Sequence, residues 1–242
     1  MNDPVPAFVT EFNKIMDECA TFRYITRDSE LQKEACTKLR GLLAQIEAKK
    51  KSAKASGDEE YANLLLGCGC VASALNSEIN MWLLLKEGRP DQAWDELVAA
   101  QSNLSSAMRA DEGFGHLDDH IRRLDAIELH IFPPQVFLSS GMIVKSQICS
   151  ICGEEYEDCE HVKGCPYMGK FCTVRLIASA VDHVALVDDP ANKRCRILKF
   201  SAEGGYRNRM TWLIEPSDDA KDEATPGLRT QGIVATTVTF AE

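Results

Sequence analysis

The spacing of apolar residues changes near the middle of the chain, from a helical repeat to short β-type runs. From Pro6 to about His130, apolar side chains recur every three or four residues, as expected for helices that bury one face. The strongest pattern runs from about Asp58 to Lys86. Others lie near residues 8–19, 31–46, 90–108 and 116–127. Because the connections are short, the sequence predicts an antiparallel bundle of about five helices over residues 1–130.

After Phe132-Pro133-Pro134 the pattern is typical of β-structure, because short runs rich in β-branched and aromatic residues are bounded by turn residues. The predicted strands are 136–144, 173–178, 182–187, 194–200, 210–214 and 233–240. We therefore expect an α+β protein. Its helical bundle domain, residues 1–130, is followed by a β-rich, barrel-like domain, residues 131–242.

Five of the chain's ten cysteines fall between Cys149 and Cys172. Cys149 and Cys152 are separated by two residues and followed by Gly153, a spacing that lets both thiolates face one metal ion. Cys159 and His161 complete a set of three thiolates and one imidazole. Such a soft four-donor set predicts a structural zinc knuckle, inserted between two strands at 149–172, with no coordination position open to water.

The sequence leaves the exact ligand set open, because Cys172 could replace Cys159. Cys165 is the weaker candidate, since Pro166 restrains the backbone beside it and Lys163-Gly164 is typical of a turn. Disulfides are not expected, because the chain begins MNDPVPAF and shows no basic segment followed by an apolar one. We therefore expect reduced thiols and a cytoplasmic protein.

Composition narrows the choice of partners. The net charge is −10, with 27 basic and 37 acidic residues, and such a balance argues against a surface that follows nucleic-acid phosphates. The longest apolar run is too short to span a bilayer. We therefore expect no membrane and no nucleic acid, and we expect the partner to be another protein.

Residues with catalytic potential are few. Asp182-His183 could form an acid–base pair, and Ser139-Ser140-Gly141 could present a nucleophile to His130 or His183. The chain contains neither a G-x-S-x-G elbow nor a glycine-rich phosphate loop. His116 and His120 have the spacing of metal ligands on one helical face, but the HExxH pattern is absent. These patterns favour a binding protein over an enzyme.

The stretches FLSSGMIVKSQICSICGEEYEDCEHVKGCPYMGKFC and VDHVALVDDPANKRCRI resemble the zinc-knuckle segment and final strands of phage prohead-protease-like proteins. The match covers about Phe137 to Ile197. It implies a barrel-like, zinc-bearing module and places Ser139 near the S-x-G nucleophile of that family. Because helices replace the family's upstream strands, we expect a non-catalytic, zinc-stabilised adaptor in a phage-related or antiphage assembly. The alternative is a serine protease or other hydrolase that uses Ser139.

Overall fold

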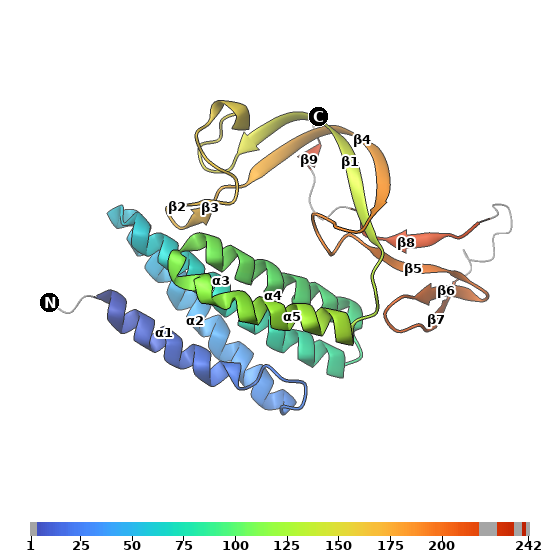
Figure 1. The fold of residues 1–242 in the computed structure, drawn as a ribbon, viewed down its shortest axis with the longest axis horizontal. Helices are drawn as coiled ribbons and strands as arrows, with labels where there is room; N and C mark the ends of the chain where they lie inside the picture. The colour runs from blue at the N-terminus through green and yellow to red at the C-terminus, as the bar shows by residue number, and fades with distance from the viewer. Residues whose placement is uncertain (1–3, 218–226, 235–238, 241–242) are drawn as a thin grey trace. The chain divides into compact units, whose positions relative to one another are not determined.

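The computed structural model describes residues 4–217, 227–234 and 239–240. Within them, five α-helices precede the strands, as predicted (Figure 1). The helices are α1 (Pro4–Ala20), α2 (Ser29–Ser56), α3 (Glu59–Lys86), α4 (Pro90–Ala110) and α5 (Asp118–Ile131), with a 3-10 helix, η1 (Glu112–Leu117), before α5. None of these helices is both long and apolar enough to cross a membrane.

Polar caps and a glycine set the limits of the two longest helices, α2 and α3. Asp28 Oδ1 accepts hydrogen bonds from two backbone N–H groups in the first turn of α2, at 2.9 and 3.1 Å. Gly57 ends that helix with a φ of 74°, in the left-handed region that favours glycine. Asp58 then caps α3 by accepting from the Tyr61 N–H at 3.0 Å. Each cap satisfies donors that have no partner inside the helix.

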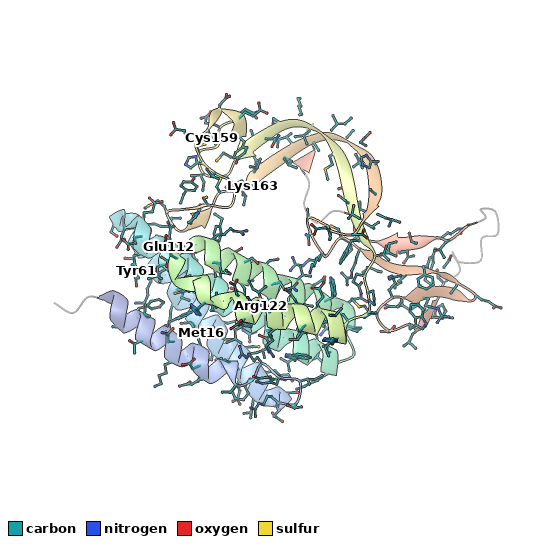
Figure 2. All side chains as sticks on the ribbon, viewed as in Figure 1. Met16, Tyr61, Glu112, Arg122, Cys159 and Lys163 are labelled. Atoms are coloured by element: carbon teal, nitrogen blue, oxygen red, sulfur yellow. The ribbon has the colours of Figure 1, made fainter. Side chains whose placement is uncertain are left out.

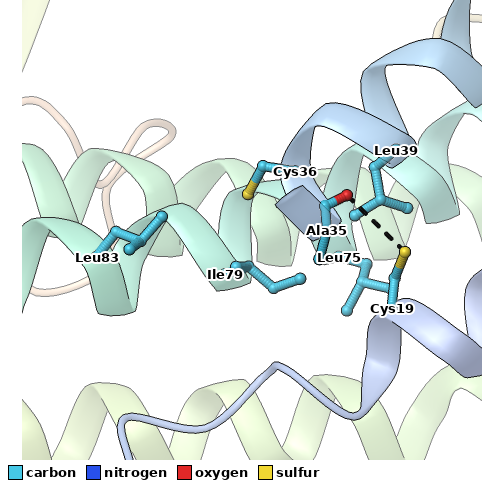
Figure 3. Packing of buried hydrophobic residues seen from close by; sticks show 7 residues of the cluster. All are labelled: Cys19, Ala35, Cys36, Leu39, Leu75, Ile79 and Leu83. Atoms are coloured by element: carbon cyan, nitrogen blue, oxygen red, sulfur yellow. Dashed lines mark hydrogen bonds between the residues drawn. The ribbon is translucent and has the colours of Figure 1, made fainter. Parts of the chain in front are cut away.

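Side chains of α1, α2 and α3 form the central apolar cluster of the helical part (Figure 3). Its members are Cys19, Ala35, Cys36, Leu39, Leu75, Ile79 and Leu83. The helix α3 is central, because it packs against both α2 and α4. This arrangement explains why α3 carries the strongest apolar pattern of the sequence.

One carboxylate lies inside this apolar part of the protein. Glu78 of α3 is fully buried, and it accepts hydrogen bonds from two α5 side chains, Arg123 and His120, the latter at 2.7 Å. Arg123 also donates to the backbone oxygen of Arg23 at 2.7 Å. Burial lowers the pKa of His120 to about 4, so the imidazole is neutral near pH 7 and donates one N–H to Glu78. The network therefore ties α5 to α3 and to the loop after α1.

The strands of the described residues form three sheets. The strands β1 (Phe137–Cys149), β4 (Val174–Val187) and β9 (Thr239–Phe240) lie in the order β1-β4-β9, with β9 parallel to β4. A second sheet pairs β2 (Pro166–Tyr167) with β3 (Lys170–Phe171). The third is antiparallel, in the order β7-β6-β5-β8, and consists of β5 (Ile197–Ala202), β6 (Gly205–Asn208), β7 (Ile214–Pro216) and β8 (Thr230–Gly232).

The β-rich part differs from the sequence prediction in several details. The described strands do not close into a barrel, because closure requires the two edge strands of a sheet to pair with each other, whereas each sheet here ends in two separate edges. The predicted strands 173–178 and 182–187 form one continuous strand, β4. Residues 210–213 form a turn, held by Asn208 Oδ1, which accepts from the Met210 and Thr211 N–H groups at 2.8 and 3.1 Å. Residues 235–238 of the last predicted strand lie outside the described residues.

The contacts divide the chain into two compact units. One comprises Met1–Ala126 and Cys149–Val174, and the other comprises Ile127–Ile148 and Arg175–Glu242. The cysteine-rich segment is inserted between β1 and β4, as predicted, but its contacts place it with the helices. This grouping differs from the predicted boundary, which assigned the segment to the domain 131–242. The reason is a set of hydrogen bonds to α3 that sequence spacing does not reveal.

Candidate metal centre

The loop after β1 turns sharply at the first cysteine pair. The Gly153 N–H donates to the Cys149 carbonyl at 3.0 Å, and the Cys149 N–H donates to the Glu154 carbonyl at 2.9 Å. Gly153 has a φ of 82°, which residues with a Cβ rarely adopt. The Ile151 N–H donates to Cys149 Sγ at 3.4 Å. The turn therefore directs a backbone dipole at the sulfur of Cys149.

The structure brings together the four residues that the sequence predicts as ligands. The donor atoms of Cys149, Cys152, Cys159 and His161 all lie within 4.8 Å of one another. Cys149 is buried, Cys152 is exposed, and Cys159 and His161 are half-buried. Figure 2 shows Cys159 on the loop between β1 and the β2–β3 hairpin. Three thiols and one imidazole at these separations can surround a single ion.

Backbone hydrogen bonds prepare one of these thiols to bind. The N–H groups of Cys152 and Ile151 lower the pKa of Cys149 to about 6, because they stabilise the thiolate charge. Burial raises the pKa of Cys159 and raises that of nearby Cys172 to about 11. Since only a thiolate binds a metal, Cys149 is ionised and ready to bind near neutral pH. The Cys159 thiol would release its proton as a metal binds.

His161 supplies a direct test of whether a metal fits. Its Nδ1 is buried, and no described residue forms a hydrogen bond with it. A buried polar atom without a partner costs free energy, and a metal ion would provide that partner. The ring is held in place by Tyr167, which it meets edge-on with ring centroids 4.7 Å apart. Together with the thiols, this nitrogen makes a donor set that suits zinc.

Two tyrosines, which the sequence analysis did not single out, fix the loop that carries His161. The Tyr167 hydroxyl accepts from the Val162 N–H at 2.9 Å. The Tyr156 hydroxyl accepts from the Lys163 N–H at 3.0 Å. Their signal in the sequence is the presence of two tyrosines in a segment that is otherwise mainly polar and cysteine-rich. Because both hydroxyls bind the backbone beside His161, they restrict the position of the imidazole.

The β2–β3 hairpin attaches the cysteine-rich segment to the helices. Its two-residue turn, Met168-Gly169, has φ values of 46° and 71°, positive at both positions as in a type I′ turn. The N–H of the first turn residue donates to Glu59 Oε1 at 3.1 Å, and that of the second donates to Asn63 Oδ1 at 2.8 Å. Both acceptors belong to the start of α3. In addition, the Arg109 guanidinium of α4 lies over the Phe171 ring at 5.8 Å.

The remaining metal candidates are placed differently. His116 donates to the Gly113 carbonyl at 3.0 Å, and His120 binds Glu78, so these imidazoles do not share a site. Cys165 is exposed. Cys172 is buried beside the four-residue cluster. In the described ranges, that cluster is the sole group of three or more metal donors close enough to hold one ion.

Ser139 and His183 lie on the neighbouring strands β1 and β4. His183 Nδ1 is 2.9 Å from Asp182 Oδ2, so the two side chains of the proposed acid–base pair form a hydrogen bond. The imidazole lies against Gly141, where an added Cβ would be 2.3 Å from His183 Cε1. Because residues two apart on a strand share a face, Ser139 is on the same side of β1 as this imidazole. His130, the other candidate base, is exposed in the last turn of α5.

Fold and site together define the class of this protein: an α+β protein with a Cys3His cluster that could bind a metal. Comparison of the chain with models of protein families, with curated proteins and with solved structures gives no match. All ten cysteines are free thiols. Function is therefore inferred from the residues of the cluster and from the exposed surfaces of each unit.

Proposed function

We propose that this chain is a non-catalytic, zinc-stabilised protein-interaction or adaptor protein. The observation that carries the proposal is the cluster of Cys149, Cys152, Cys159 and His161, whose donor atoms lie within 4.8 Å of one another. Four protein donors fill a tetrahedral zinc ion, so no position is left at which water could be activated. A bound zinc ion would cross-link the cysteine-rich loop, and the protein side chains would hold that loop against α3.

Exposed apolar side chains on the β1–β4 sheet support a protein partner. They include Ile143 (56 % exposed) and Val181 (52 %) and, on the face of β4 opposite to Val181, the pair Val184 (50 %) and Leu186 (68 %). Large apolar residues that gather on a surface commonly mark interaction sites. Free thiols support a cytoplasmic location, because such compartments keep cysteines reduced. A phage-related or antiphage assembly is the context that the sequence resemblance suggests.

The test measures metal content and partner binding separately. The purified protein is expected to contain close to one zinc per chain by elemental analysis, and Cys152→Ser is expected to lose it. In extracts of the native host, a protein that co-purifies with the wild type should be lost from the double variant Val184→Asp/Leu186→Asp, whose two positions share one face of β4. The matched control is Leu129→Asp, an apolar residue on α5 that is 75 % exposed. Identical co-purifying proteins in all three samples would contradict the proposed binding surface.

A serine hydrolase is the second candidate function. It is favoured by the position of the His183 imidazole against Gly141, on the face of β1 that also carries Ser139. Such an enzyme would use Ser139 as nucleophile, His183 as base and Asp182 to orient it. A serine-reactive probe should then label the wild type and Ser140→Ala, whose side chain is on the opposite face, but not Ser139→Ala. Equal labelling, or none, in all three proteins supports the adaptor.

A further inference from the structure

A further thiol, that of Cys172, lies beside the four-residue cluster but outside the set whose donor atoms are all within 4.8 Å of one another. The Sγ atoms of Cys172 and Cys149 are 3.8 Å apart, and Cys172 is only 1 % exposed. In a tetrahedral zinc site the bonds to sulfur are about 2.3 Å long, so two bound sulfurs are separated by about 3.8 Å. The Cys172 sulfur therefore stands at the distance from Cys149 that two ligands of one ion would have.

The backbone around Cys172 fixes this position from two sides. The Cys172 N–H donates to the Cys165 carbonyl at 2.9 Å, and the Gly164 N–H donates to the Cys172 carbonyl at 2.8 Å. The next residue, Thr173, donates to Ser150 Oγ at 2.8 Å, and its carbonyl accepts from the Ser150 N–H at 2.9 Å. Cys172 is thus held between the loop of the first cysteine pair and the loop that follows His161.

Cys165 offers an internal contrast. It pairs with Cys172 through the backbone, but its side chain is exposed. In the sequence, Cys165 is close enough to His161 to serve as a substitute metal ligand. What distinguishes the two cysteines is therefore the direction of the side chain, since only the Cys172 sulfur is buried against Cys149. Cys165 serves as the matched control for any effect of removing a thiol from this loop.

We propose that Cys172 is a second donor for the fourth coordination position, which it can take in place of His161 while the other three thiolates stay bound. This inference rests on the proposed metal site. In the exchange the bond from the ion to the His161 nitrogen breaks, a bond to the Cys172 sulfur forms, and the thiol proton leaves to solvent. The imidazole departs neutral. The segment would then keep its ion through the loss of one ligand.

The test uses Co²⁺ as the probe, in the full-length chain, because its visible spectrum reports the number of bound thiolates. A fourth thiolate adds sulfur-to-cobalt charge-transfer intensity and moves the d–d bands to lower energy. His161→Ala is expected to bind one Co²⁺ per chain with this four-thiolate spectrum. The double variant His161→Ala/Cys172→Ser is expected to bind more than about 100-fold more weakly. The control, His161→Ala/Cys165→Ser, should match His161→Ala alone.

Equal, weak binding by His161→Ala and by His161→Ala/Cys172→Ser would overturn the role of Cys172. Repeating the comparison with His161→Gln, which keeps a polar side chain beside Tyr167, separates loss of a ligand from a packing defect. A wild-type chain that binds no metal would refute the proposed function itself, and this inference with it. A wild type that binds one ion, with no four-thiolate spectrum in either His161 variant, would refute only the second donor.

Discussion

Substitution of Gly169 by alanine tests whether the cysteine-rich segment is seated on α3. Gly169 has a φ of 71°, and its N–H donates to Asn63 Oδ1 at 2.8 Å. An added Cβ would lie 2.9 Å from Lys50 Cγ and 3.1 Å from the Ala62 carbonyl oxygen. The lysine side chain can move aside. The carbonyl belongs to the backbone of α3, so the hairpin itself must shift.

Two contributions to the loss of unfolding free energy can be separated. A non-glycine residue in the left-handed conformation costs about 1–2 kcal/mol, and restriction of the unfolded chain by alanine returns part of that, about 0.4–1 kcal/mol. Gly88 has a φ of 70° and no atom within 4 Å of an added Cβ, so Gly88→Ala measures this backbone contribution alone. At Gly169 the shift also weakens the bond to Asn63, worth about 0.5–1.5 kcal/mol, and disturbs the contact with α3. We expect Gly169→Ala to cost about 1–2 kcal/mol more than Gly88→Ala.

The assay is urea denaturation of both variants and the wild type, each in the same excess of zinc, the proposed metal, with unfolding monitored by far-UV circular dichroism. Hydrogen exchange in the first turns of α3 provides a second readout, and it should increase in Gly169→Ala only. If the two variants lose the same free energy within about 0.5 kcal/mol, and α3 exchanges at the wild-type rate, the hairpin does not rest on α3 as described.

Four further outcomes are expected. Glu78→Ala removes the carboxylate that binds two α5 side chains, and it should lower the free energy of unfolding, measured by urea denaturation, by about 3–5 kcal/mol. The control Glu30→Ala, at an exposed ion pair, should lower it by less than about 1 kcal/mol. Similar losses in the two variants would contradict the buried network. Because the pKa of His120 is lowered to about 4 in the folded chain, the unfolded chain binds more protons between that pH and about 6.5, so stability should fall by about 1 kcal/mol from pH 7 to 5.5. The part of the slope that His120 contributes should be absent in His120→Asn, and a slope equal to that of the wild type would assign the whole fall to other groups. Removal of the proposed zinc ion by a chelator should increase hydrogen exchange at the start of α3, where the hairpin is attached. An increase confined to the cysteine-rich segment would show that the metal site and α3 are independent. Finally, Ser139→Ala should leave both the melting temperature and partner binding unchanged, and loss of function in a folded Ser139→Ala protein would favour the hydrolase.

Local patterns in the sequence determined the helices and the metal donors. The apolar repeats around Leu39 and Ile79 predicted two helices, and the inward faces of these helices contribute to the central cluster. The cap at Asp28 and the spacing of Cys149 and Cys152 depend only on residues within a few positions. Such features can be predicted because the interacting groups are neighbours in the chain, so the backbone geometry of one turn fixes their separation.

The packing of distant elements determines where the cysteine-rich segment is attached and which charged groups are buried. The Gly169–Asn63 hydrogen bond joins residues 106 positions apart, and the His120–Glu78 hydrogen bond joins residues 42 apart. No periodicity marks Glu78 as buried, and the spacing that offered Cys172 as an alternative to Cys159 does not place its sulfur 3.8 Å from that of Cys149, because each depends on which distant element packs against it. The sequence carries the chemistry of each side chain, while the distance between two donors far apart in the chain is set by packing, which is a property of the whole fold.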